Sequence, residues 1–160
     1  MPLTRRSTGS LLDDTLSAVG TSFIFSGDGV VDVTISSNTL DRYVPALRQA
    51  GENLRLRLVL HDFGLVWQHA DSEERRVLVA AEPERFDARW DAFLAAYAEH
   101  VCYHAGIAPP AWVFDPCRYL RSFWHPGEQF ASDRFWAVLT APAAFEVHGI
   151  WLPQRELQVV

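Results

Sequence analysis

The hydrophobic and polar positions of the chain predict a short β-rich segment followed by helices. Residues 23–25 and 30–35 are rich in β-branched and aromatic side chains, which are typical of strands. Glycine and aspartate at residues 27–29 tolerate the positive φ angles of a tight turn, so the two runs predict a β-hairpin. Because an isolated hairpin is unstable in water, we expect it to pack against the rest of the chain.

A first helix is predicted after this hairpin. Leu40, Val44 and Leu47 recur at the i, i+4, i+7 spacing of one helical face. Pro45 lies inside the pattern and is expected to kink or shorten the helix, and Gly51 can end it.

The next apolar stretch fits two kinds of element. Leucines alternate with other residues over positions 54–60, as in a strand, yet Leu56, Leu60, Phe63 and Trp67 also follow helical spacing. The length of the pattern favours a helix. Residues 71–74 (Asp-Ser-Glu-Glu) are a capping signal for another helix, which ends before a proline at position 83.

The strongest helical pattern lies in the middle of the chain. Asp87 or the preceding proline turn begins this helix, and Gly106 ends it. Its buried face is predicted from apolar and aromatic residues that step by three or four: Phe86, Trp90, Phe93, Tyr97, Val101 and His104.

The C-terminal third is predicted to hold short helices and much aromatic surface. Two prolines at positions 109–110 exclude a helix there, and short helices are expected over residues 134–140 and 142–149. Taken together, the pattern predicts an α+β fold, mostly α, with a small N-terminal β-hairpin packed on a helical C-terminal body. Residues 1–10 are expected to be a flexible tail. Residues 11–160 are expected to be one globular domain, with the hairpin and a helix in 11–51 and the helical body in 52–160.

Composition and charge narrow the function. The chain has 49% hydrophobic residues, which suits a globular protein, and a formal net charge of −6, which opposes direct binding to nucleic acid. No signal peptide or membrane-spanning run is evident, and Cys102 and Cys117 are expected to be free thiols. We therefore expect a soluble cytoplasmic protein without a membrane association.

Two candidate sites follow from the residue types. His100 and His104 are four residues apart on the central helix, so both imidazoles can reach one metal ion, although no third ligand is specified. A recognition surface is the other candidate, because an irregular segment gathers side chains that dominate protein interfaces: Arg118, Tyr119, Arg121, Phe123 and Trp124. No motif for nucleophilic catalysis or phosphate binding is present.

Several short segments together resemble a known family: residues 89–100, Gly106, and residues 111–113, 121–124, 141–145, 149–152 and 156–157. Over roughly residues 54–158 they resemble the C-terminal region of bacterial Xre-type regulators and candidate antitoxins. Those proteins often carry a helix-turn-helix domain ahead of this region and tend to be encoded beside nucleotidyltransferase-type toxins. The resemblance implies partner binding and carries over no catalytic residue. Residues 1–51 do not fit a helix-turn-helix.

The sequence therefore favours a non-catalytic regulatory or antitoxin-like module that binds another protein, such as a cognate toxin or a neighbouring gene product. No cofactor is expected, and the oligomeric state is left open. Two alternatives are a metal-dependent enzyme that uses His100 and His104, and a DNA-binding regulator.

Overall fold

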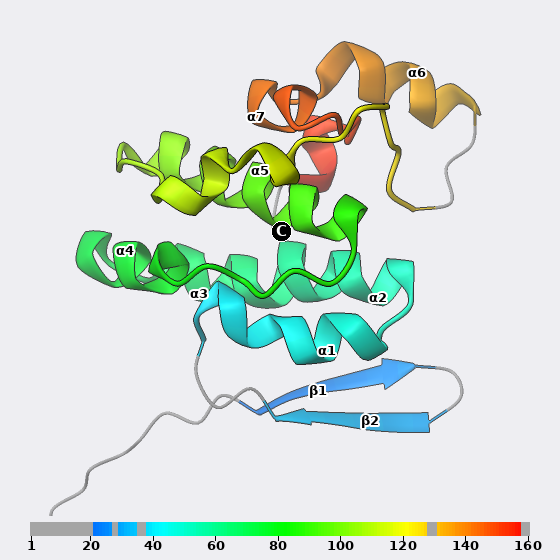
Figure 1. Ribbon diagram of the computed structural model, residues 1–160. Coiled ribbons are helices and arrows are strands. Elements are labelled where there is room, and N and C mark those ends of the chain that lie inside the picture. The colour runs from blue at the N-terminus through cyan, green and yellow to red at the C-terminus, as the bar shows by residue number, and fades with distance from the viewer. Residues whose placement is uncertain (1–20, 27–28, 35–37, 128–130, 158–160) are drawn as a thin grey trace, which may run out of the picture.

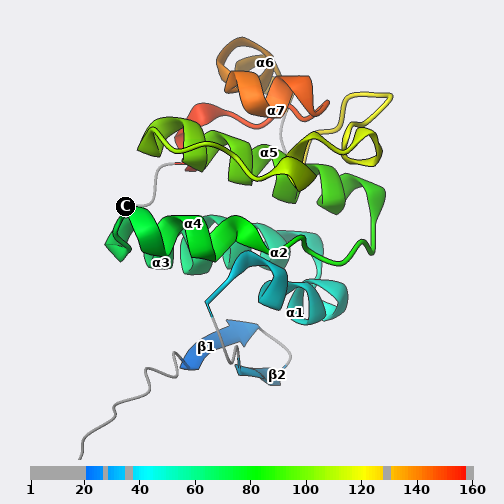
Figure 2. The same ribbon diagram turned by 60° about the vertical axis from the view of Figure 1, so that its left-hand side comes forward.

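Helices stacked in layers on either side of α5 make up the body of the protein (Figure 1). A computed structural model describes residues 21–26, 29–34, 38–127 and 131–157. Figures 1 and 2 show α1 on one outer side, then α2, α3 and α4, then α5, with α6 and α7 on the opposite side. The α-helices are α1 (Val44–Gln49), α2 (Glu52–Arg57), α3 (Gly64–His69), α4 (Ser72–Ala80), α5 (Ala88–Ala105), α6 (Ala131–Thr140) and α7 (Ala143–Val147).

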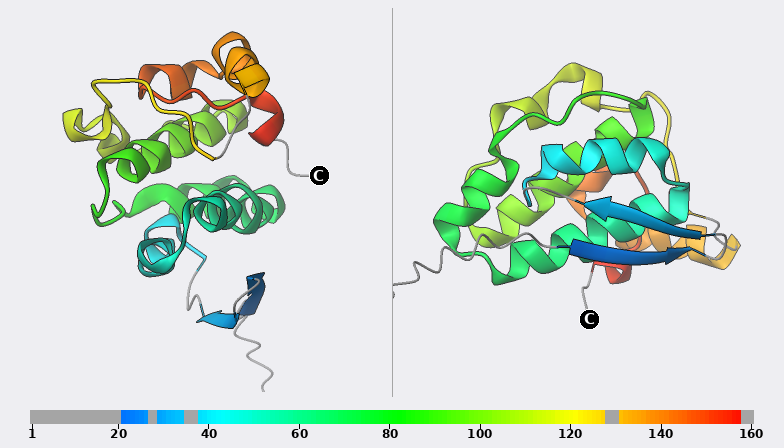
Figure 3. Two further views of the ribbon diagram at one scale, coloured as in Figure 1. Left: turned by 90° about the vertical axis from the view of Figure 1, so that its right-hand side faces the viewer. Right: turned by 90° about the horizontal axis from the view of Figure 1, so that it is seen from below.

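The expected α+β fold class is wrong. Strands β1 (Thr21–Ser26) and β2 (Gly29–Thr34) pair only with each other, and Figure 3 shows them to one side of the helices. From residue 38 onward the described chain contains no strand, and an isolated bridge between Trp124 and Ile150 is its sole extended pairing. A strand pair becomes part of a fold by burying one face against another element, and no helix packs extensively on these strands. The body is therefore helical, and no hairpin is packed on it.

Some of the N-terminal expectations fall outside the described residues. The predicted tail over residues 1–10 and the turn at residues 27–28 are among them. The first helix begins as a 3₁₀ turn, η1 (Leu40–Tyr43), and continues as α1. Pro45 lies in the first turn of α1, where its missing N–H is not needed, so it helps to start the helix and does not kink it.

The ambiguous leucine-rich stretch is helical, as predicted. Helix α2, the π-helical segment η2 (Leu58–Phe63) and α3 follow one another without a break from residue 52 to residue 69. Gly51 has an extended backbone and caps the start of α2, so it does not end α1 in a left-handed turn. Leu58, Val59 and Leu60 are all buried in the wider π turn.

The two helices with capping signals begin where the sequence indicated. Asp71 Oδ1 accepts hydrogen bonds from the backbone N–H groups of Glu73 and Glu74, and the Asp71 N–H donates to Oε2 of Glu74, which completes a capping box before α4. Asp87 caps α5 in a similar way. Helix α5 ends at Gly106, whose φ of 66° lies in the left-handed region that glycine adopts without strain.

Helix α5 supplies the centre of the hydrophobic core. Trp90, Phe93 and Tyr97 are buried on it as predicted, whereas His104 is exposed. Phe93 meets Phe145 of α7 edge-to-face, with ring centroids 5.5 Å apart. Such pairs add about 1 kcal/mol each to the burial of their surface, so they hold α7 against α5.

The C-terminal third folds back over α5. After α5 the chain forms two short 3₁₀ turns, η3 (Ala111–Phe114) and η4 (Pro116–Arg118), both in contact with α5. Trp112 Nε1 donates to the carbonyl of Val79, 2.9 Å away, and so ties this segment to α4. A last 3₁₀ turn, η5 (Gln154–Leu157), ends the described chain. The short helices expected near residues 134–140 and 142–149 correspond to α6 and α7.

Candidate functional site

Arg118, predicted to bind a partner, lies inside the protein with no exposed surface. Its guanidinium donates to the carbonyls of Pro83 at 2.8 Å and Asp91 at 3.3 Å, and to the carboxylate of Glu82 at 3.0 Å. It also lies 4.8 Å from the ring centroid of Trp112. All of these contacts are internal, so Arg118 can affect partner binding only by positioning its neighbours.

The other four predicted partner-binding residues divide between core and surface. Trp124 is only 7% exposed and packs edge-to-face on Trp90. Tyr119 is half-buried, whereas Arg121 and Phe123 are exposed. Only these last three have surface to offer to a partner. A single recognition surface made by all five side chains is therefore not what the fold presents, and partner binding by Tyr119, Arg121 and Phe123 stays a prediction.

The histidines predicted as an alternative metal site do meet on α5. The ring centroids of His100 and His104 are 4.4 Å apart, and His100 also packs on Phe145. Burial, and then the proximity of His104, lower the pKa of His100 to about 4, so its imidazole is neutral at pH 7. Within the described ranges no third histidine, cysteine or carboxylate completes a metal-binding group with them. The pair alone does not support a metal centre.

A third histidine, at the C-terminal end of α7, pairs with a carboxylate of α5. His148 is fully buried, and its Nδ1 lies 2.7 Å from the carbonyl oxygen of Arg118. Its Nε2 lies 3.0 Å from Oε2 of Glu99, and its ring stacks on Tyr119 at 4.3 Å. A carbonyl oxygen can only accept, so Nδ1 carries a hydrogen. Nε2, the other ring nitrogen, then faces the carboxylate of Glu99.

Helix α6 has an unusual orientation, because its apolar side chains face solvent. Phe135, Trp136, Val138 and Leu139 are 62%, 52%, 41% and 59% exposed, whereas Ala137 on the opposite side is fully buried. A surface helix of a monomer normally turns its apolar stripe inward. We call these four exposed side chains the α6 face. A contiguous apolar patch of this kind is typical of a binding surface.

A groove of about 890 Å³ lies beside the α6 face, between the C-terminal half of α5 and the α6–α7 connection. We call it the α5–α7 groove. Leu139 belongs to both surfaces, so the two are continuous. The walls of the α5–α7 groove are mainly apolar. Among the described residues that line it, Glu99 is the sole carboxylate and there is no arginine. The lining residues are Glu99, His100, Tyr103, His104, Gly106, Ile107, Pro109, Leu139, Thr140, Ala141, Pro142, Ala143, Ala144 and Gln154.

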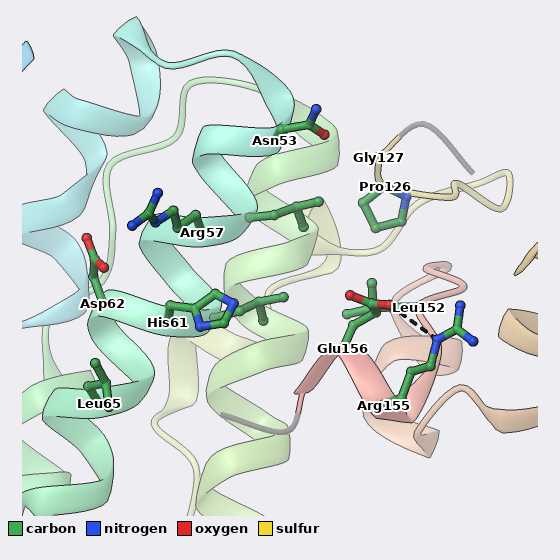
Figure 4. Close-up of a pocket in the computed structure, with 12 residues that line it drawn as sticks. Asn53, Arg57, His61, Asp62, Leu65, Pro126, Gly127, Leu152, Arg155 and Glu156 are labelled. Atoms are coloured by element: carbon green, nitrogen blue, oxygen red, sulfur yellow. Dashed lines mark hydrogen bonds and ion pairs between the residues drawn. The ribbon is translucent and has the colours of Figure 1, made fainter. Parts of the chain in front are cut away.

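A second, more polar groove of about 680 Å³ lies between the α2–η2 helix and the C-terminal segment (Figure 4). Arg57, His61 and Asp62 come from the α2–η2 helix, and Arg155 and Glu156 pair with each other on the facing wall. Burial raises the pKa of the Asp62 carboxyl. Charges of both signs line this groove, and its described lining contains no serine, threonine or cysteine nucleophile. The mixed charges therefore do not favour a ligand of one sign of charge.

Sequence reasoning missed the features that now look most functional. It predicted a helix at α6 but not that its apolar side would face outward. It also gave no sign that Glu99 and His148, 49 residues apart, would form a pair.

Comparisons with family models, with characterised proteins and with solved structures find no match to this chain. The resemblance to Xre-type regulators and candidate antitoxins thus stays an expectation. Over the part of the chain that the structure describes, no helix is long and apolar enough to cross a bilayer.

Proposed function

We propose that this protein is a non-catalytic, antitoxin-like regulatory module and that it binds another protein through the α6 face. The observation that carries this proposal is the outward orientation of Phe135, Trp136, Val138 and Leu139. Aromatic side chains contribute much of the hot-spot energy in protein interfaces, and Phe135 and Trp136 are the two aromatic residues of the α6 face.

The occupant that fits best is a protein of different sequence and not a second copy of this chain. Each copy carries a formal net charge of −6, so two copies repel one another at low salt, whereas a basic partner is attracted. We also propose that the protein is cytoplasmic and that its partner is the product of a neighbouring gene, such as a cognate toxin. Direct binding to nucleic acid is disfavoured by the same charge.

The experiment compares wild-type protein with Trp136→Ser and with a matched control, Val77→Ser. Val77 is 62% exposed on α4, away from the α6 face, so its replacement alters exposed apolar surface without touching the proposed site. Each tagged variant is purified from native cells, stoichiometric partners are identified by mass spectrometry, and the purified pair is titrated calorimetrically. Circular dichroism checks that both variants remain folded.

We expect one stoichiometric protein partner with wild type and Val77→Ser, and an affinity lowered about 30-fold by Trp136→Ser, the effect typical of an interfacial tryptophan. Equal affinity of the three proteins would refute the α6 face as the binding surface. Self-association that Trp136→Ser abolishes, without any other partner, would instead identify a second copy as the occupant and overturn the proposal.

A further inference from the structure

We propose that the α5–α7 groove receives a basic side chain, arginine or lysine, from the partner protein, and that Glu99 pairs with its charge. This inference rests on the proposed function, since the groove is continuous with the α6 face through Leu139. It adds that the partner carries a cationic side chain next to the apolar segment that covers the α6 face.

The charge of the groove fits a cation. Among its described lining residues Glu99 is the one carboxylate, and no arginine lies there to neutralise it. The side chain of Glu99 is 26% exposed, so it is reachable from solvent yet partly shielded from it. His100 does not offset the carboxylate at neutral pH, because the low pKa of its buried imidazole keeps the ring uncharged.

The geometry holds this carboxylate in place before a partner arrives. His148 is buried, and Arg118 contributes the carbonyl oxygen that receives its Nδ1–H, which fixes the direction of Nε2 toward Glu99. Oε2 of Glu99 is the oxygen that faces His148 Nε2, so Oε1 can accept a hydrogen bond from an arriving cation.

Aromatic and apolar groups around Glu99 suit the rest of a basic side chain. Tyr103 is 78% exposed at the groove, so the face of its ring is available for a cation–π contact. Leu139, Pro142 and Ala143 line the groove as well and can cover the methylene stem of the incoming residue. An acid beside an open aromatic ring and apolar walls is a site for arginine or lysine rather than for an anion.

A test that needs no partner uses a small probe, N-acetyl-arginine amide, titrated into the isotope-labelled full chain and followed by NMR. The neutral analogue N-acetyl-norleucine amide serves as the probe control. Glu99→Gln removes the charge while keeping a side chain that can still hydrogen-bond to His148. Glu146→Gln is the matched protein control, because Glu146 is an exposed acid on the neighbouring α7 and does not line the groove.

We expect the arginine probe to shift the resonances of Tyr103 and His104, and Glu99→Gln to weaken this binding about fivefold, the effect of one partly exposed charge pair. Glu146→Gln should leave the binding of the arginine probe unchanged. The neutral probe should not bind. Equal binding of the arginine probe to wild type and Glu99→Gln would overturn the inference while leaving Trp136 and the proposed function untouched. Conversely, failure of Trp136→Ser to weaken the partner would refute the proposed function without altering this titration.

Discussion

At the scale of single residues, Arg118 shows how a side chain typical of interfaces can serve the interior. Its planar guanidinium donates to two backbone carbonyls and a carboxylate and lies over Trp112, so it joins the segment before α5 to the segment after it. Its own carbonyl accepts from His148. One residue therefore supports both the core and the orientation of the Glu99–His148 pair.

Replacement of Arg118 is expected to destabilise the fold. Arg118→Met keeps the apolar stem but leaves the Pro83 carbonyl without its partner in the interior and removes the donors to Asp91 and Glu82, for a loss of about 3 kcal/mol in the free energy of unfolding. Arg118→Lys should recover only part of this, because an ammonium cannot reproduce the fork of donors.

Urea denaturation measures the effect of these changes, with Arg121→Met as the control. Arg121 is exposed, so its replacement should change stability by less than about 0.5 kcal/mol. Similar stabilities of Arg118→Met and Arg121→Met would contradict the structural role of Arg118.

At the scale of elements, the irregular segment over residues 120–124 is bound by backbone hydrogen bonds to the residues that follow α7. The N–H of Leu120 donates to the carbonyl of His148, and that of Trp124 donates to the carbonyl of Gly149. Gly149 has a φ of 80°, and a Cβ at this position would lie only 2.9 Å from Cβ of Leu120. Both the turn after α7 and the close packing against Leu120 therefore favour glycine at position 149.

Two of the left-handed glycines, Gly106 and Gly149, are expected to respond differently to alanine. Gly106→Ala meets no atom within 4 Å and should cost about 1 kcal/mol, the strain of the left-handed backbone alone. Gly149→Ala places its Cβ 2.9 Å from Cβ of Leu120 and 3.1 Å from the Leu120 carbonyl oxygen, so it should cost about 3 kcal/mol. Thermal and urea unfolding of the two variants compares them directly. Equal costs would show that the close approach at Leu120 relaxes without penalty.

At the scale of the whole molecule, the described chain separates into a helical body and a strand pair. Helix α5 contacts α4, α7, η3 and η4, so the core is shared by segments from both ends of the body. Strands β1 and β2 pair with each other and pack extensively on none of these helices (Figure 3). The stability of the body should therefore depend little on the strands.

A shortened chain tests this separation. A variant that begins at Asn38 should unfold at the same urea concentration as the full chain, within about 0.5 kcal/mol in free energy, because it keeps every described core residue, from Leu40 onward. Far-UV circular dichroism should show unchanged helical signal per molecule. A clear drop in the unfolding midpoint would mean that residues before 38 do pack on the body.

The sequence by itself determined the position of most helices and their ends. Helical spacing predicted α5 and the α2–α3 stretch, and Asp71 and Gly106 marked ends, because periodicity and capping depend on residues a few positions apart. Only the tertiary structure decided which way α6 faces, that Arg118 and Trp124 are buried, and that Glu99 meets His148. These outcomes depend on contacts between residues far apart along the chain, about which local spacing carries no information. The same reason explains why a strand pattern near residue 30 did not make the fold α+β: pairing is local, but membership of a core requires another element to cover it.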